Sequence, residues 1–239
     1  MSNGDVDPYM GLMHPSLTRP IQLRLLGEFD VAVDDVNCTR AIHYTKPRFL
    51  LAILALSRGK PQTRADLAGM LWPTTQQDSR ANLRQALFVL RRLFKSVPDA
   101  WDSTNHAIAL NPDVVMVDVL ALLGSYSGLG YWERLAYDRG GLLEHMAMPD
   151  STAFTAWRGN WQSRIEREIS ECREGLICEL TGAGEQDRAL EYAKQWVHQH
   201  PADEGAYRHL IRLLHDMGND EAAWLAMQHC RSAMLKHHN

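Results

Sequence analysis

The sequence contains few of the features that mark membrane, secreted or metal-binding proteins. Its 239 residues include no run of 18 or more apolar residues, and the N-terminus lacks the positive start and apolar stretch of a secretory signal. The four cysteines show neither CxxC pairing nor zinc-finger spacing. We therefore expect a cytoplasmic protein with no membrane contact, no disulfides, no metal and no cofactor.

Motifs of common enzyme classes are also missing. The sequence contains no Walker loop, GxGxxG, HExxH or GxSxG pattern, the arrangements that position phosphates, metal ions and nucleophiles. The carboxylates between residues 166 and 174 are better explained as a solvated helix face than as an acid–base pair. Aromatic residues could line a groove for a small ligand, but at helical spacing they are more often core residues. We predict no enzymatic activity and no catalytic residues.

Acidic residues are scarce in one segment, although the whole chain carries a formal net charge of −4. Residues 40–95 hold eleven Lys or Arg against two Asp, a local net charge of +9, which leaves −13 for the rest of the chain. A concentrated positive field suits the binding of a polyanion, while an acidic remainder favours solubility. This asymmetry indicates a basic module joined to an acidic one.

The basic module is expected to begin with a small antiparallel sheet. Residues 1–20 show no periodicity and predict a flexible arm. Alternating apolar residues predict two strands in residues 21–27 and 29–34, separated by a turn. A short third strand is expected at residues 41–44.

Three helices are expected after the sheet. The first, residues 46–58, is capped by Thr45 and is apolar nearly all round, so it should be the buried centre of the module. The second, residues 63–72, begins with a pattern related to the capping box. The third is expected to begin with Asp78 or Ser79 as its cap.

A hairpin completes the basic module. Residues 107–110 and 114–118 predict its two strands, and the Asn-Pro-Asp sequence between them predicts the turn. A sheet, three helices and a hairpin follow one another in a winged helix-turn-helix domain. We assign residues 21–118 to such a domain.

The third helix has two faces of opposite character. Its apolar arc contains Leu83, Ala86, Leu87, Leu90, Leu93 and Phe94. Its opposite arc contains Arg80, Arg84, Phe88, Arg91 and Lys95. No acidic residue occurs from position 79 to 95, whereas exposed helices usually mix charges of both signs. A membrane-bound helix would need its apolar face free, but the two preceding helices require that face. The pattern therefore favours a polyanion over an ordinary solvated face.

If this helix enters the major groove of DNA, its first turns should reach the base edges. Arg80 and Arg84 can then pair with guanine, Gln85 with adenine, and Phe88 can contact a thymine methyl group or a sugar. Residues farther along the helix are expected to contact phosphates. The remaining expected DNA-binding residues are Arg91, Arg92 and Lys95 on the helix, Arg64 on the preceding helix and His106 in the hairpin.

The acidic module is predicted to be helical from about Trp161 onward, and it repeats with a period of 34 residues. Five pairs of positions match, namely Leu176 and Leu210, Ile177 and Ile211, Leu180 and Leu214, Gly184 and Gly218, and Ala189 and Ala223. This period is typical of tetratricopeptide repeats, in which paired helices stack. A connector with helices at residues 131–137 and 151–158 is expected before the repeats, so we assign residues 119–239 to an all-α domain.

Two segments resemble a known family. Residues 46–94, KPRFLLAILALSRGK through ANLRQALFVLRRLF, closely resemble the DNA-binding domain of SARP-type transcriptional activators, which has an OmpR-like winged helix. Residues 137–165 look like the start of the bacterial transcriptional activator domain, a tetratricopeptide-like module. The resemblance implies an activator that binds direct repeats near promoters, commonly as paired protomers, and contacts RNA polymerase.

The number of repeats departs from what a stable stack usually needs. Two clear repeats are present, whereas three or more are usual. Either the connector helices serve as the missing unit, or the chain is a fragment of a longer protein with a further effector module.

Two hypotheses for function follow from the sequence. In the first, a mainly α protein binds double-stranded DNA as a transcriptional regulator, and its helical domain mediates homodimerisation, partner contact or signal input. In the second, the repeats form a protein-interaction scaffold and the basic module docks an acidic partner. Salt-sensitive binding to random duplex DNA separates the two.

Overall fold

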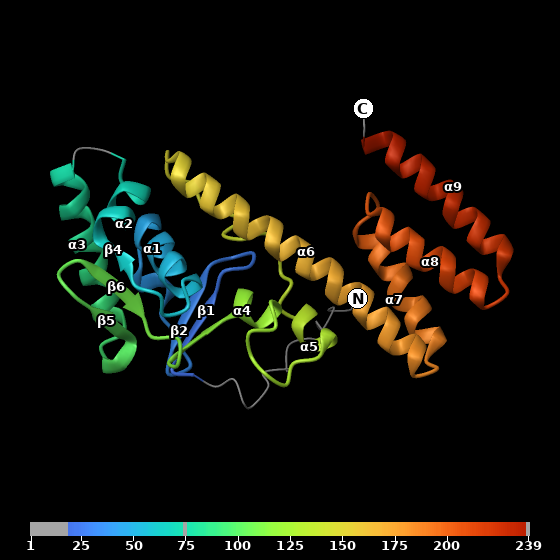
Figure 1. The fold of residues 1–239 in the computed structure, drawn as a ribbon, viewed down its shortest axis with the longest axis horizontal. Helices are drawn as coiled ribbons and strands as arrows, with labels where there is room; N and C mark the ends of the chain where they lie inside the picture. Colours follow the sequence, from blue (N-terminus) through green and yellow to red (C-terminus); the bar gives the residue numbers. More distant parts are fainter. Residues whose placement is uncertain (1–18, 74–75, 238–239) are drawn as a thin grey trace, which may run out of the picture. The chain divides into compact units, whose positions relative to one another are not determined.

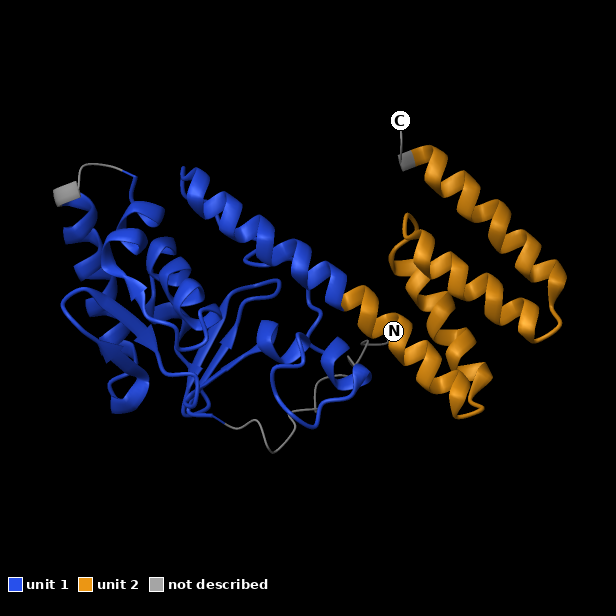
Figure 2. Cartoon of the chain, viewed as in Figure 1, with its two compact units in different colours: residues 1–168 blue, residues 169–239 orange. Residues whose placement is uncertain are grey.

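The computed structural model describes residues 19–73 and 76–237. The chain forms two compact units, residues 1–168 and 169–239 (Figure 2). Most of the expected arm, residues 1–18, lies outside the described residues. None of the helices in the described part of the chain combines the length and apolarity that a bilayer-spanning helix needs. The domain limits expected from the sequence, 21–118 and 119–239, stay predictions.

The first sheet of the N-terminal unit contains four strands in the order β3-β2-β1-β7. Figure 1 labels β1 and β2 of this sheet. β1 (Ile21–Arg24) pairs antiparallel with β2 (Asp30–Val33), as the alternating residues predict. On its other side β1 pairs in parallel with β7 (Val115–Val117). All three residues of β7 are buried, so both faces of this strand are covered by other parts of the protein.

The third strand lies earlier than predicted. β3 is Val36–Asn37, and the predicted residues 41–44 hold the last residue of η2 (Thr39–Ala41) followed by irregular chain, so the expected strand at 41–44 is wrong. The cause is the turn after β2: Asp34 and Asp35 both have positive φ, 49° and 62°. Two consecutive residues with positive φ form the two-residue turn of a tight β-hairpin. The returning strand therefore begins directly after them, at Val36.

The second sheet forms the wing, and it differs from the predicted hairpin. Its order is β4-β6-β5, with β6 (Ala107–Leu110) between β4 (Gln62–Thr63) and β5 (Trp101–Ser103). The wing is therefore residues 101–110, and the expected pairing of 107–110 with 114–118 is wrong. The segment 114–118 instead contributes β7, which pairs with β1 in the first sheet.

The three helices follow the predicted order with small shifts at their starts. In α1 (Thr45–Leu56) every residue from Phe49 onward is buried, which confirms it as the centre of the unit. Its N-cap is Tyr44, so the expected cap, Thr45, is the first helical residue instead. The cause is local: the backbone of Tyr44 is still extended, and its side chain makes no capping hydrogen bond.

The start of α2 (Arg64–Leu71) follows the prediction, whereas that of α3 (Gln76–Leu93) does not. The Thr63 hydroxyl accepts a hydrogen bond from the Asp66 N–H at 3.1 Å, which confirms the expected cap of α2. α3 begins before Asp78 and Ser79, so neither is its cap. The Ser79 hydroxyl instead donates to the Trp72 carbonyl at 2.6 Å and closes the turn between the two helices.

A buried carboxylate joins the sheet to the chain that follows it. Asp118, the first residue of α4 (Asp118–Leu122), is 1% exposed. Its oxygens accept hydrogen bonds from the N–H groups of Leu25 and Leu26 at 2.9 Å and of Val119 at 2.7 Å. Burial raises the pKa of Asp118 to about 6, although these donors and the Arg139 guanidinium, 3.7 Å away, oppose the shift.

The segment around Arg139 packs tightly against the end of β1. The Gly27 N–H donates to the Gly141 carbonyl at 2.9 Å, and the Leu143 N–H donates to the Leu25 carbonyl at 2.8 Å. Gly27 has a φ of +70°, and a Cβ added there would lie 2.3 Å from the Arg139 carbonyl oxygen. Only glycine fits this position without displacing backbone.

The two helices expected in the connector are present, but the second is not a separate helix. α5 (Tyr131–Leu135) lies within the expected range of 131–137. The helix expected at 151–158 continues without a break as α6 (Thr152–Gly182). At its start, Phe154 is fully buried against Phe49 of α1, with ring centroids 4.7 Å apart.

The C-terminal unit contains the paired helices that the repeats predict. The end of α6 is followed by α7 (Gln186–Gln199), α8 (Glu204–Asp216) and α9 (Asp220–His237). Gly184 and Gly218, one repeat period apart, end the first helix of each pair and have similar φ values, +78° and +75°. Ala189 and Ala223, also one period apart, belong to the same buried cluster.

We expect Gly27→Ala to destabilise the protein more than Gly128→Ala. Both glycines have positive φ, +70° and +87°, but a Cβ at position 128 would meet nothing within 4 Å. Gly128→Ala therefore measures the backbone strain alone, about 1 kcal/mol, and Gly27→Ala adds the clash with Arg139. Urea denaturation of both variants measures the difference, and equal losses would show that the packing at Gly27 is looser than described.

Asp118→Asn should change how stability depends on pH. The folded-state pKa of Asp118, about 6, lies above its ordinary value of 3.8. Asp118 therefore contributes stability that is present below pH 4 and lost as pH rises through 6. The free energy of unfolding of the wild type, relative to the variant, should fall by about 2.5 kcal/mol from pH 4 to 7. Urea titrations at four pH values test this, and a constant difference contradicts it.

Candidate nucleic-acid interface

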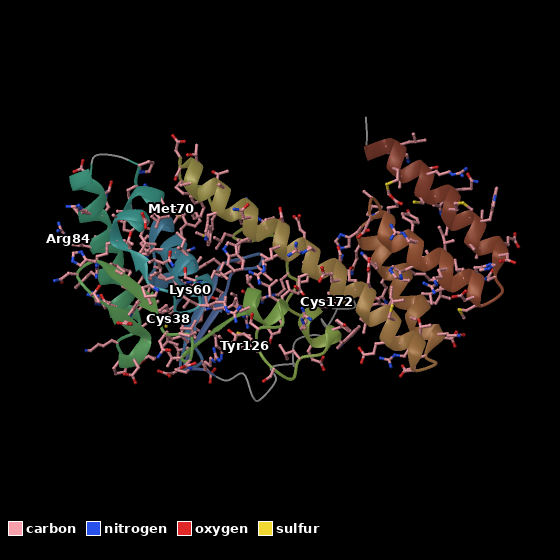
Figure 3. The ribbon with its side chains drawn as sticks, in the orientation of Figure 1. Cys38, Lys60, Met70, Arg84, Tyr126 and Cys172 are labelled. Atoms are coloured by element: carbon pink, nitrogen blue, oxygen red, sulfur yellow. The ribbon has the colours of Figure 1, made fainter. Side chains whose placement is uncertain are left out.

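The two faces of α3 lie as the helical wheel predicts. Leu83, Ala86, Leu87, Leu90 and Phe94 are buried, and α3 packs against α1 and α2. The cations Arg80, Arg84, Arg91, Arg92 and Lys95 are exposed, as is Gln85. Figure 3 shows Arg84 on the outer face of α3. Leu93, expected in the buried arc, is half-buried.

Phe88 lies in the middle of the cationic face and is 61% exposed. A phenylalanine with this exposure gains little from the protein core, so its place between Arg84 and Arg91 is not explained by packing. An aromatic ring in that position can contact an apolar group on a ligand.

The cations of this face have no acidic partners. Among the residues that the structure describes, neither Arg64 nor any of these five cations forms an ion pair with Asp or Glu. Exposed cations on ordinary surfaces are usually interspersed with acids. The positive potential of α3 is therefore not neutralised by ion pairs within the described part of the N-terminal unit.

The wing is fixed to the end of α3 by aromatic packing. Trp101 of β5 stacks on Phe94, with ring centroids 5.6 Å apart and planes inclined by 25°. At its tip, the Thr104 hydroxyl accepts from the Ala107 N–H at 3.0 Å and shapes the turn that carries His106. His106 is exposed, and its carbonyl accepts from the Arg64 N–H at 2.8 Å.

Two arginines meet at a serine of the wing. Arg64 Nη2 and Arg91 Nη2 both donate to Ser103 Oγ, at 2.9 and 2.8 Å. Arg64 Nε also donates to the Thr104 carbonyl at 3.1 Å. Partial burial and the nearby charge of Arg91 lower the pKa of Arg64.

The predicted site residues thus fall into two groups. Arg64, Arg91 and His106 meet where α2, α3 and the wing come together. The others extend along α3, with Arg80 near its start and Lys95 just beyond its end. The sequence reasoning missed Ser103 and Thr104, because it placed the hairpin after residue 106. A polar Ser-Thr-Asn-His stretch was the available signal.

Ligands of a metal are not assembled in the described residues, which contain no cluster of three or more His, Cys, Asp or Glu suited to a metal ion. Cys38, Cys172, Cys178 and Cys230 are free thiols. The chemistry of the surface is therefore that of guanidinium and ammonium groups, which bind anionic oxygens.

Comparison with known families decides the nature of the C-terminal part. Residues 137–237 match the family described as the bacterial transcriptional activator domain. The chain is thus similar to this domain family over 101 of its 239 residues. This domain begins before α6 and includes all four of the long helices from α6 to α9.

A solved structure is similar over most of the chain. It is Mycobacterium tuberculosis EmbR in complex with a low-affinity phosphopeptide, with a TM-score of 0.66 and 15% sequence identity. The match covers 92% of this chain and 61% of EmbR, so the chain spans about three fifths of that protein. No curated protein matches the chain in sequence.

These findings confirm the resemblance and the fold class that the sequence predicts. The chain has a mainly helical fold like that of EmbR, and the end of this fold matches the bacterial transcriptional activator domain.

Proposed function

We propose that the N-terminal unit binds double-stranded DNA in a sequence-specific manner, with α3 in the major groove. The observation that carries this proposal is the unneutralised cationic face of α3, with the exposed Phe88 at its centre. A helix of this kind, preceded by a second helix and flanked by a wing, has the form of a recognition helix.

Different parts of α3 would have different roles. Arg80, Arg84 and Gln85 lie in its first half and are exposed, so they are the residues to read base edges. Arg91, Arg92 and Lys95 lie near the wing and would contact phosphates. His106, at the exposed tip of the wing, would contact the DNA backbone beside the adjacent minor groove.

We further propose that the protein is a cytoplasmic activator that binds direct repeats near promoters as paired protomers. The activator domain and its two helical repeats support this role, because stacked repeats offer surfaces for protein contacts. The helical domain would then mediate homodimerisation, signal input or contact with RNA polymerase. Residues 21–118 would be the DNA-binding domain and residues 119–239 the activator domain.

The full chain should bind random duplex DNA with a strong dependence on salt. If about five phosphates are neutralised per protomer, the slope of log affinity against log salt concentration should be about −4.5. Fluorescence anisotropy between 50 and 200 mM salt measures this slope. Absence of binding at low salt would overturn the proposal and favour the scaffold hypothesis.

Arg84→Ala and Lys95→Ala should differ in their effect on specificity. Arg84 is proposed to pair with one base, so its loss should relax one position of the binding site by about 1 to 3 kcal/mol. Lys95 is proposed to contact phosphate, so its loss should weaken all sequences alike. Selection from a random DNA library with each variant measures both effects. Identical selectivity profiles would contradict the division of roles along α3.

A further inference from the structure

The meeting point of Arg64, Arg91 and Ser103 has the composition of an anion site. Three elements supply it: the first turn of α2, the last part of α3 and strand β5 of the wing. Two guanidinium groups donate to a single neutral hydroxyl oxygen, at 2.9 and 2.8 Å. Two positively charged guanidinium groups are thus held close together, with only the neutral Ser103 hydroxyl between them.

The arrangement is unfavourable without an anion. Neither Arg64 nor Arg91 forms an ion pair in the described part of the chain, and the charge of Arg91 acts on Arg64 directly. Two guanidinium groups that donate to the same oxygen lie close enough to repel each other. An anion bound between them would attract both. A phosphate group offers oxygens that fit the fork of each guanidinium.

The guanidinium of Arg64 is also held in position. Arg64 is fixed by the bond from its Nε to the Thr104 carbonyl and by the bond from its backbone N–H to the His106 carbonyl. The wing that supplies these carbonyls is itself anchored to α3 by Trp101 on Phe94. Each guanidinium has five N–H donors, and most of them remain free for a ligand. Little conformational entropy is lost when an anion binds such a site.

We propose that Arg64 and Arg91 together bind one phosphate group at the junction of α3 and the wing, with Ser103 Oγ occupying the place of a phosphate oxygen when the site is empty. The ligand class is a phosphate, either a backbone phosphate of duplex DNA or free inorganic phosphate. The first source rests on the proposed function, and the second does not. The phosphate would fix the wing relative to α3, and the two arginines would act as one unit.

A double-mutant cycle tests whether the two arginines share a ligand. Arg64→Gln and Arg91→Gln should each weaken duplex binding about tenfold, and the double variant should lose clearly less than the product of the two. Arg40→Gln is the matched control, because exposed Arg40 in η2 carries the same charge away from α3. If the two affinity losses multiply, or if neither exceeds the loss in Arg40→Gln, the shared site is overturned. Duplex binding by the wild type would still support the proposed function.

Substitutions at Ser103 test the place of its hydroxyl. Ser103→Asp puts a carboxylate between the two arginines, so it should weaken duplex binding as much as the double Arg variant. In the double Arg→Gln background the same substitution should have little further effect. Ser103→Ala removes only the neutral acceptor and should retain wild-type affinity. A uniform loss from Ser103→Asp in both backgrounds would show a general charge effect and overturn the proposal.

Inorganic phosphate distinguishes the two sources. The Nε–Hε signals of Arg64 and Arg91 in the full chain can be followed by NMR during titration with phosphate and, separately, with duplex DNA. Joint shifts with phosphate in a protein that does not bind duplex would support the phosphate site and overturn the proposed function. Joint shifts with duplex support both. No shift of the two signals with either ligand would overturn the site.

Discussion

The carboxylate of Asp118 is the interaction on which the architecture of the N-terminal unit depends. It accepts hydrogen bonds from the end of β1 and the start of α4, and it lies beside Arg139 of the connector. β1 is the strand that pairs on one side with β2 and on the other with β7. Since β7 directly follows the wing in the chain, the carboxylate fixes the end of the wing at the same time as the sheet.

This arrangement separates the scaffold from the proposed DNA-binding surface. The scaffold uses buried apolar side chains and one charged group whose hydrogen bonds are made by backbone. The surface uses exposed cations on α3, positioned by an apolar arc that reaches α1 and α2. Substitutions on the exposed arc can therefore change binding without disturbing the core beneath it.

Features that depend on local periodicity could be predicted from the sequence. The two faces of α3 follow from the order of residues within one helix, and the period of 34 residues follows from comparing the chain with itself. The structure shows both. The pairing of strands could not be predicted in the same way. Val115–Val117 satisfies its apolar pattern equally well beside β6 or beside β1, and only the long-range parallel pairing with β1 decides between them.

The wing shows the same limit for the candidate site. Its strand β5 contains one apolar residue, Trp101, so it gives no alternating pattern in the sequence. Ser103 is an ordinary polar residue until the fold brings Arg64 and Arg91 to it from 39 and 12 positions away. Charge composition located the cationic segment, but only the tertiary structure shows which of its arginines converge.

The tight turn after β2 contacts the chain just beyond the cationic end of α3. The Asp34 carboxylate accepts a hydrogen bond from the Ser96 hydroxyl at 2.9 Å, directly after Lys95. Asp35, beside it, accepts from the Gln22 amide at 2.9 Å. Asp34 thus places a carboxylate beside the end of the cationic segment, next to Lys95. From Arg80 to Leu93 the helix rises about 20 Å, which would set the length of the surface that α3 offers in the proposed complex with DNA.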